Sequence, residues 1–188
     1  MEIIIREPNK YKRRTAWFQN GARNDTVTDV KFLDEHTLVV ANREDSKMYL
    51  VEFSLNPNSI NIISSLDLIY DNQPRLVDLF TLHKNKIWFV SLDDTICTVN
   101  IVDRKLVKDK IIYLGNKCQF HGINFDPEDD DILYLSGAMN DRTLTKYRLS
   151  DQKIIKREPL SGMERKLLKQ CRFIKNDYFF FPIIIKRL

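Results

Sequence analysis

Glycine is scarce in this sequence, and none of its five glycines belongs to a phosphate-binding loop or to a Gly-x-Ser-x-Gly nucleophile turn. The sequence also has no Cys-x-x-Cys pair and no His-Glu-x-x-His helix, so the usual redox and zinc-protease signatures are absent. No short motif therefore indicates a reaction. The sequence is more informative about architecture than about activity.

Long apolar runs are also missing. No run approaches the roughly 20 residues that a membrane-spanning helix needs, and the N-terminal apolar run Ile3–Ile5 is too short for a secretory signal. The three cysteines, Cys97, Cys118 and Cys171, are widely spaced and each lies beside apolar residues. This pattern is typical of buried free thiols in a reducing compartment. We therefore expect a cytoplasmic protein without membrane contact.

The charge excess is small, because 30 basic and 26 acidic residues leave a net charge of +4. The only dense basic cluster is Lys10–Arg14, which we expect to be a solvated N-terminal arm. A nucleic-acid-binding surface needs a clustered basic stripe, so the composition argues against nucleic acid as a partner. With 188 residues and 43% hydrophobic content, the chain can bury a core, and one domain is expected.

The stretch 118–150 gives the clearest pattern of short strands. Its first apolar run ends at Asp126-Pro127, because proline fixes its own φ and moves the preceding residue away from helical angles. The acids Glu128–Asp131 repel one another, so we expect them in a solvated turn. Turn residues separate four runs of strand-forming residues, which cover 120–125, 132–135, 143–149 and 153–156. These runs predict four short antiparallel strands in one twisted sheet.

The same order of runs and turns recurs along the chain. Phe32, Thr81, Phe125 and Phe173 stand at equivalent places of the repeat, and their spacing matches the roughly 40–50 residues of a four-stranded propeller blade. We predict one all-β, β-propeller-like domain over residues 1–188, with about three and a half four-stranded antiparallel blades. The blades are expected at 26–68, 75–114 and 118–160, with a partial blade at 170–188. An ordinary β-sandwich or open meander remains the alternative.

One short helix is predicted between the third and the partial blade. Ser161 and Glu164 have the spacing of a capping box, in which each side chain bonds the other residue's backbone N–H. Met163 and Leu167 then share one face, and the helix is expected to end near Lys169.

Two stretches resemble known propeller repeats. Val39–Ser54, VVANREDSKMYLVEFS, resembles the YVTN-type repeat. The stretch around His121, in which a His-Gly-Ile step precedes an acidic turn and an apolar strand, resembles gluconolactonase and NHL-type blades and the paraoxonase family. These resemblances imply a propeller fold and do not assign a family. No set of Glu, Asp and Asn positions matches the calcium ligands of the lactonase families.

The innermost strand of a propeller blade lines the central channel, and its polar residues are the candidate site. They are Asp29, Asp78, His121 and Arg172. We expect Asp29 and Asp78 at equivalent places, with His121 one position away. Asp29, Asp78 and His121 could bind a divalent cation or act as acid and base, and the paraoxonase-like step makes His121 the candidate catalytic base. Alternatively, each aspartate bonds backbone amides of a neighbouring loop, and His121 is only hydrogen-bonded.

Other polar groups give weaker signals. The acids of 126–131 lack the alternating ligands and the glycine of an EF-hand loop, and His36 and His83 lie in turns without a visible partner. We interpret the chain as a non-catalytic binding module with an unknown partner. The alternative is a metal-dependent lactonase- or esterase-like hydrolase that uses His121 and the channel aspartates. An open fan of blades would expose apolar faces and strand edges, which predicts self-association or binding to another protein.

Overall fold

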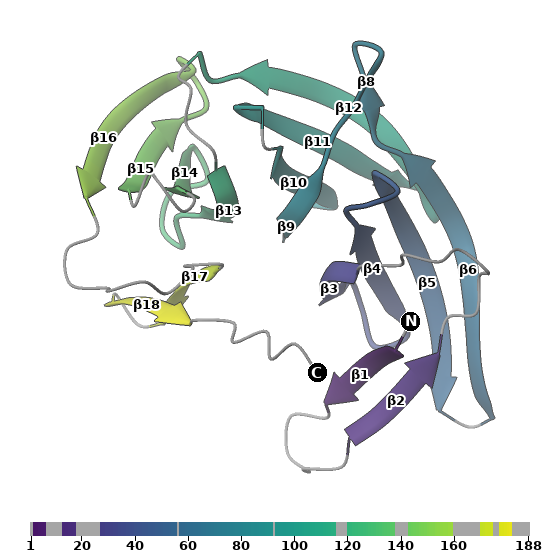
Figure 1. Ribbon diagram of the computed structural model, residues 1–188. Coiled ribbons are helices and arrows are strands. Elements are labelled where there is room, and N and C mark those ends of the chain that lie inside the picture. The colour runs from purple at the N-terminus through teal and green to yellow at the C-terminus, as the bar shows by residue number, and fades with distance from the viewer. Residues whose placement is uncertain are drawn as a thin grey trace.

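The chain folds into antiparallel β-sheets, which confirms the predicted all-β, propeller-like fold (Figure 1). The computed structural model describes residues 2–6, 13–17, 27–55, 57–91, 93–115, 120–137, 143–159, 170–174 and 177–181. These residues contain strands and turns and no helix. The helix predicted for 161–169 lies outside them.

Three four-stranded sheets form the body of the fold, and each has its strands in sequence order. Blade 1 contains β3 (Val27–Phe32), β4 (Thr37–Asn42), β5 (Lys47–Leu55) and β6 (Asn58–Asp67). Blade 2 contains β9 (Val77–His83), β10 (Lys86–Ser91), β11 (Thr95–Val102) and β12 (Lys105–Tyr113). Blade 3 contains β13 (Phe120–Phe125), β14 (Ile132–Gly137), β15 (Thr143–Arg148) and β16 (Lys153–Pro159).

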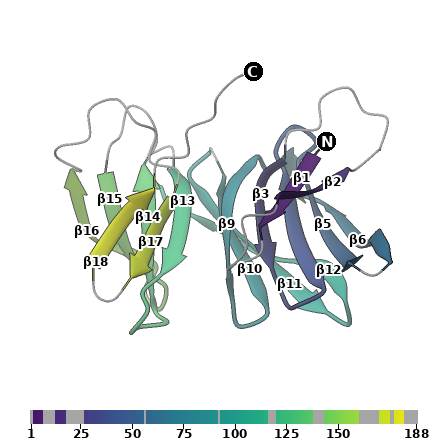
Figure 2. The same ribbon diagram turned by 90° about the horizontal axis from the view of Figure 1, so that it is seen from below.

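Three two-stranded hairpins accompany the blades. They are β1 (Glu2–Arg6) with β2 (Arg13–Trp17), β7 (Ile69–Tyr70) with β8 (Gln73–Pro74), and β17 (Gln170–Ile174) with β18 (Asp177–Phe181). Figures 1 and 2 show β1–β2 beside blade 1 and β17–β18 beside blade 3, so the blades form a curved fan with β3, β9 and β13 on its inner side.

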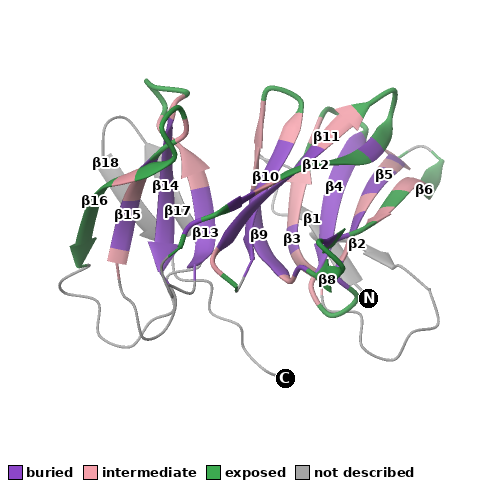
Figure 3. Ribbon diagram, turned by 90° about the horizontal axis from the view of Figure 1, so that it is seen from above, coloured by how far each residue is buried: buried purple, intermediate pink, exposed green. Residues whose placement is uncertain are grey.

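The core lies between the blades, because alternate residues of a strand point to opposite faces of its sheet. In β10, Ile87 and Phe89 pack into the cluster shared with blade 1, whereas Trp88 and Val90 pack into the cluster shared with blade 3. Each fully buried large side chain of this kind stabilises the fold by about 1.5–3 kcal/mol. Figure 3 shows the consequence: β10 and β14 are buried, and the outermost strand β16 is exposed.

Tight turns connect the strands with little help from glycine. Lys84-Asn85, Asp71-Asn72 and Asp103-Arg104 have φ between 49° and 59° at both turn residues. Two-residue hairpins prefer this left-handed geometry, because its twist matches that of the flanking strands. The few glycines are therefore compatible with many hairpins, since Asn, Asp and even long side chains take the positive-φ places.

The strand register corrects the alignment of the repeat. A bulge interrupts the pairing near the start of each inner strand: after Val27 in β3, after Val77 in β9 and after Phe120 in β13. Val27, Val77 and Phe120 each pair with the last residue of the second strand of their blade, so they are equivalent. The residues that follow them, Thr28, Asp78 and His121, are therefore equivalent as well. The expectation that Asp29 and Asp78 are equivalent, with His121 one position away, is therefore wrong. A bulge adds a residue to one strand only, so a count of apolar runs cannot detect it.

Candidate functional site

Three polar side chains meet at the inner side of the fan, one from each blade. Asp78 of β9 accepts a hydrogen bond at Oδ1 from Nη1 of Arg43, at 2.9 Å, and its Oδ2 pairs with Nδ1 of His121. Arg43 comes from the turn between β4 and β5, and His121 from the bulge of β13. The Asp78 side chain is 6% exposed and that of His121 is 11% exposed. The Arg43 side chain is 37% exposed, so the triad links all three blades through a buried carboxylate and a half-exposed guanidinium.

Asp29 has separate partners on the seam between blades 1 and 2. Its Oδ2 accepts a hydrogen bond from the backbone N–H of Phe80, at 3.1 Å, and its Oδ1 accepts one from the N–H of Val30, at 3.0 Å. Lys31 adds an ion pair at 3.2 Å. Burial raises the pKa of the Asp29 carboxyl, and Lys31 opposes that shift. In the alternative interpretation, an inner-strand aspartate bonds backbone amides of a neighbouring loop. Asp29 does bond backbone amides, but they belong to its own strand and to β9 of the next blade.

The sequence-predicted residues are therefore only partly brought together. Asp78 and His121 pair, whereas the contacts of Asp29 are with Val30, Lys31 and Phe80. Within the described residues, no three His, Cys, Asp or Glu side chains are grouped so that they could hold a metal ion. Arg172 belongs to β17, whose side chains are outside the description, so its role stays a prediction.

The Asp78–His121 pair resembles a base oriented by an acid, which is a common arrangement in catalysis. Two features restrict that chemistry here. Arg43 shares the same carboxylate, so Asp78 is already neutralised by a permanent cation. Both members of the pair are also largely buried, which leaves little surface for a substrate. The contacts of the triad connect the three blades.

A second ionic cluster, at the ends of β9 and β13, corrects the interpretation of His83, which is the last residue of β9. Its ring stacks on Phe125 with the centroids 3.9 Å apart, and its Nε2 lies 3.0 Å from Oδ1 of Asp130. Lys84 pairs with the same carboxylate. The acidic turn after β13 is thus exposed, as predicted, and it also holds a contact with blade 2 that the sequence did not indicate.

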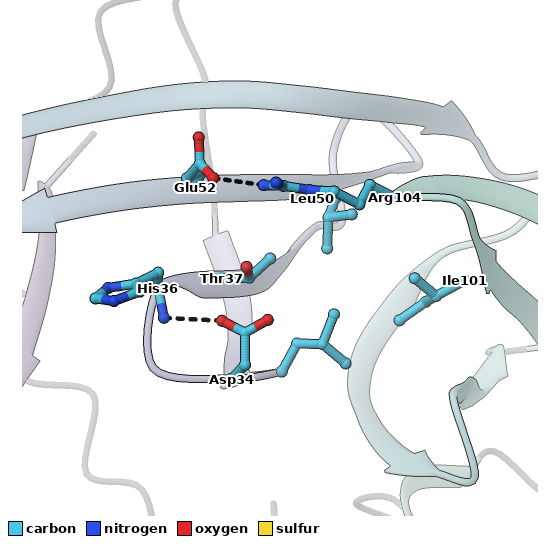
Figure 4. Close-up of a pocket in the computed structure, with 8 residues that line it drawn as sticks. Asp34, His36, Thr37, Leu50, Glu52, Ile101 and Arg104 are labelled. Carbon is cyan, nitrogen blue, oxygen red and sulfur yellow. Dashed lines mark hydrogen bonds and ion pairs between the residues drawn. The ribbon is translucent and has the colours of Figure 1, made fainter.

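An open pocket of about 400 Å³ lies between blades 1 and 2 (Figure 4). It is at the end of the blades opposite the Arg43–Asp78–His121 triad, because Asp78 and His121 lie at the starts of β9 and β13. It is formed by the β3–β4 turn, by β5 and by the end of β11 with its turn into β12. Its lining residues are Leu33, Asp34, His36, Thr37, Leu50, Glu52, Ile101 and Arg104. The pocket combines an apolar part with charged groups, and it has no counterpart in the sequence-based candidate list.

The charges of this pocket are held by local bonds. Asp34 Oδ1 accepts a hydrogen bond from the backbone N–H of His36, at 2.8 Å, and this bond lowers the pKa of the Asp34 carboxyl. Asp34 is therefore ionised at neutral pH. Nη2 of Arg104 lies 2.5 Å from Oε1 of Glu52, and this pair bridges blade 2 and blade 1 across the pocket. Both partners are accessible, with side-chain exposures of 62% for Arg104 and 41% for Glu52.

The functional residues that the sequence did not indicate lie at ordinary polar positions. Arg43, Asp34 and Arg104 lie in turns, and Glu52 is the polar residue between the buried Val51 and Phe53 of β5. Nothing in a single sequence distinguishes them from ordinary solvated turn residues. Only the packing of one blade on the next shows that Arg43 reaches Asp78 and that Arg104 reaches Glu52.

Several solved propellers have a similar fold. The β-propeller domain of Cps50 (Swd1) from Myceliophteria thermophila matches with a TM-score of 0.61 and 9% identity, over 87% of this chain and 54% of that one. The WD40 domain of Neurospora crassa Pan2 matches with a TM-score of 0.56 and 8% identity, over 79% and 41%. A candidate 6-phosphogluconolactonase from Bacteroides uniformis matches with a TM-score of 0.61 and 10% identity, over 81% and 45%.

No model of a known protein family matches the chain, and no curated protein matches it. At these identities the structural likenesses show the fold alone, which is β-propeller-like. The YVTN or NHL type is not distinguished and stays a prediction. The chain spans about half, or less, of the length of the propellers that it matches. Among the described residues there is no helix with the length and apolar character of a membrane span.

Proposed function

We propose that the chain is a non-catalytic interaction module that binds another protein. The observation that carries this proposal is the use of the inner-strand charges. Asp29, Asp78 and His121, the catalytic candidates of the sequence, each have a polar atom in a contact with a neighbouring blade. Buried, mutually paired groups of this kind stabilise a rigid scaffold, whereas accessible charged groups occur around the pocket at the opposite end.

The structural likenesses support this proposal at the level of the fold. WD40 domains are among the similar structures, and a propeller offers broad rigid faces on which loops from several blades meet. Fold alone does not fix function, so the proposal needs a direct binding test. The contacts between the blades do not identify the partner.

The test is an array of 15-residue peptides that spans acidic, basic, aromatic and aliphatic compositions, probed with the folded full chain. Binders are then titrated in solution by fluorescence polarisation. We expect saturable binding by a subset of peptides with Kd below about 100 µM, equivalent to roughly −5.5 kcal/mol, and no such binding by the urea-unfolded chain. The absence of any peptide that binds the folded chain more tightly than the unfolded chain would contradict the proposal.

The hydrolase alternative is favoured by one observation, the contact between His121 and Asp78. It requires a divalent ion near these residues and an activity that His121→Gln abolishes. The measurement is lactone and ester hydrolysis with and without added Ca²⁺ or Zn²⁺, together with the melting temperature before and after chelation. The interaction module predicts no hydrolysis and an unchanged melting temperature.

Self-association belongs to the same proposal, because β1–β2 and β17–β18 each contain two strands within the described residues and unpaired strand edges recruit other chains. Light scattering on a size-exclusion column measures the oligomeric state.

A cytoplasmic location is proposed from the thiol chemistry. Cys97 is buried, and burial raises its pKa to about 11, so this thiol is unreactive at neutral pH. Nucleic acid is not proposed as a partner.

A further inference from the structure

We propose that the pocket between blades 1 and 2 receives a lysine or arginine side chain of a partner polypeptide, and that Arg104 occupies the cation position until the partner displaces it. This inference rests on the proposed interaction function and names the chemistry of its partner. It is carried by three properties of the pocket: its apolar part, its excess of carboxylates and the exposure of its internal ion pair.

The apolar part fits the stem of a long basic side chain. Leu33 and Ile101, both half-buried, line the pocket above the buried Leu50, and all three belong to, or pack against, the core between the two blades. Lysine and arginine bury their methylene groups along apolar surface and keep the charged head at the polar end. A short acidic side chain has no comparable apolar stem with which to cover these leucine and isoleucine side chains.

The charges favour a cation over an anion. Two carboxylates, Asp34 and Glu52, line the pocket together with one guanidinium, that of Arg104. The lowered pKa of Asp34 keeps its carboxylate ionised at neutral pH. Figure 4 shows Asp34 on one side of Thr37 and the Glu52–Arg104 pair on the other, so an entering cation meets negative charge from both the β3–β4 turn and β5. An entering anion would meet these two carboxylates and a guanidinium that is already paired.

When a partner's cation displaces Arg104, one ion pair with Glu52 replaces another. Exposed ion pairs contribute little to stability, because solvent screens them and long side chains lose entropy in forming them. Arg104 is 62% exposed and comes from a two-residue turn of blade 2, whereas Glu52 belongs to the middle of β5. The backbone of Glu52 is therefore held in the sheet, the guanidinium of Arg104 can swing away, and an external guanidinium can replace it at Glu52.

The probes are two fluorescein-labelled peptides, Gly-Ser-Ala-Arg-Ala-Ser-Gly and the same peptide with lysine at its centre, titrated with the folded full chain at low salt. Citrulline and norleucine peptides replace the charge while keeping the stem. We expect the basic peptides to bind at least about fivefold more tightly than these neutral ones, and the preference to shrink at high salt, where exposed charges are screened.

Three variants locate the binding site, and they are expected to change the affinity for the basic peptides in different directions. Glu52→Gln and Asp34→Asn each weaken the basic peptides by about fivefold, and Asn keeps the oxygen that accepts the His36 N–H. Arg104→Gly removes the internal competitor and tightens the basic peptides by about twofold to fivefold. The matched control is Asp67→Asn, which removes the surface carboxylate paired with Lys47 at the start of β5 and changes the net charge equally. It leaves binding unchanged.

Other outcomes separate the two proposals. Saturable binding of peptides that is insensitive to Glu52, Asp34 and Arg104 overturns the pocket assignment and leaves the interaction function standing. Preferential binding of acidic peptides that Arg104→Gly abolishes overturns the choice of a cation. Failure of every peptide in the composition array, basic ones included, overturns the interaction function together with this inference.

Discussion

At the inner side of the fan, the Asp78 carboxylate lies between Arg43 and His121 and is 6% exposed. At the opposite end of the same blades, Glu52 pairs with Arg104, and the two side chains are 41% and 62% exposed. Both are contacts between charged groups of different blades, and both involve a residue from a turn. They differ in how much water reaches them.

This difference decides what each contact can do. A buried charge is costly to leave unpaired, so removing one partner of a buried pair destabilises a protein strongly. An exposed pair is screened by water and contributes little. The triad at Asp78 therefore acts as a scaffold, and the pair at Glu52 can be opened by a ligand without loss of the fold. The predictions below test this contrast, beginning with its buried side.

Asp78→Ala is expected to have the largest effect. It leaves the His121 ring without its acidic partner inside the protein and frees Arg43, and it removes a contact that joins three blades. We expect a loss of about 1.5–3 kcal/mol in the free energy of unfolding, the range for a hydrogen bond to a charged group, because the Arg43 side chain is 37% exposed and can reach water. Urea denaturation followed by Trp fluorescence measures it. A loss smaller than about 1 kcal/mol would show that the triad is not a scaffold.

Asp29→Asn tests the buried carboxylate of the first seam through its pH dependence. Burial raises the pKa of Asp29 in the folded chain above its ordinary value of 3.8. The folded state then holds the proton more tightly than the unfolded state, so this group adds stability below pH 3.8, and the contribution is lost as pH rises through the raised pKa. Asparagine cannot titrate.

The measurement for Asp29 is the difference in unfolding free energy between the natural chain and Asp29→Asn, at pH 7 and at pH 4. Other carboxyl groups are common to both proteins and cancel. We expect the natural chain to gain stability relative to the variant as the pH is lowered. A constant difference, or a gain by the variant at low pH, would mean that the Lys31 pair and the Phe80 and Val30 amides outweigh burial.

The architecture was predictable from the sequence because it depends on repeated, short-range patterns. Runs such as Ile132–Leu135, turns such as Asp126-Pro127 and the spacing of the repeat are local features that report strands and hairpins directly. The structure accordingly has three four-stranded antiparallel sheets. Low glycine content was no obstacle, since residues such as Asn85 and Asp103 adopt positive φ in the turns.

The site was less predictable, because it depends on contacts between blades. The sequence indicates Asp78 and His121 as inner-strand residues, but their pairing depends on the bulges that align them. Arg43 looked like any solvated turn residue until the neighbouring blade placed Asp78 within 2.9 Å. Asp34 and Glu52 drew no notice, because a pocket between two sheets leaves no periodic trace in either strand.

Thr28→Val probes the place in blade 1 that is equivalent to Asp78. The Thr28 hydroxyl donates a hydrogen bond to the carbonyl oxygen of Val77, at 2.9 Å, across the first seam. Valine keeps the shape and removes the donor, so we expect a loss of about 1 kcal/mol, the usual net value of one hydrogen bond. The same urea titration measures it. A loss as large as that of Asp78→Ala would remove the distinction between neutral and ionic contacts on the inner strands.

The smallest effects are expected at the exposed pair. Glu52→Gln and Arg104→Gly each break it, and we expect the urea midpoint to stay unchanged for the first variant, because screened surface pairs contribute little. Arg104 has φ of 59° in its hairpin turn, a conformation that glycine adopts at no steric cost and that favours a type I′ turn. Arg104→Gly is therefore expected to match the natural chain or to exceed its midpoint slightly. A clear drop in the urea midpoint of both variants would mean that the Glu52–Arg104 pair holds blades 1 and 2 together. A partner's cation could then not displace Arg104 without destabilising the fold.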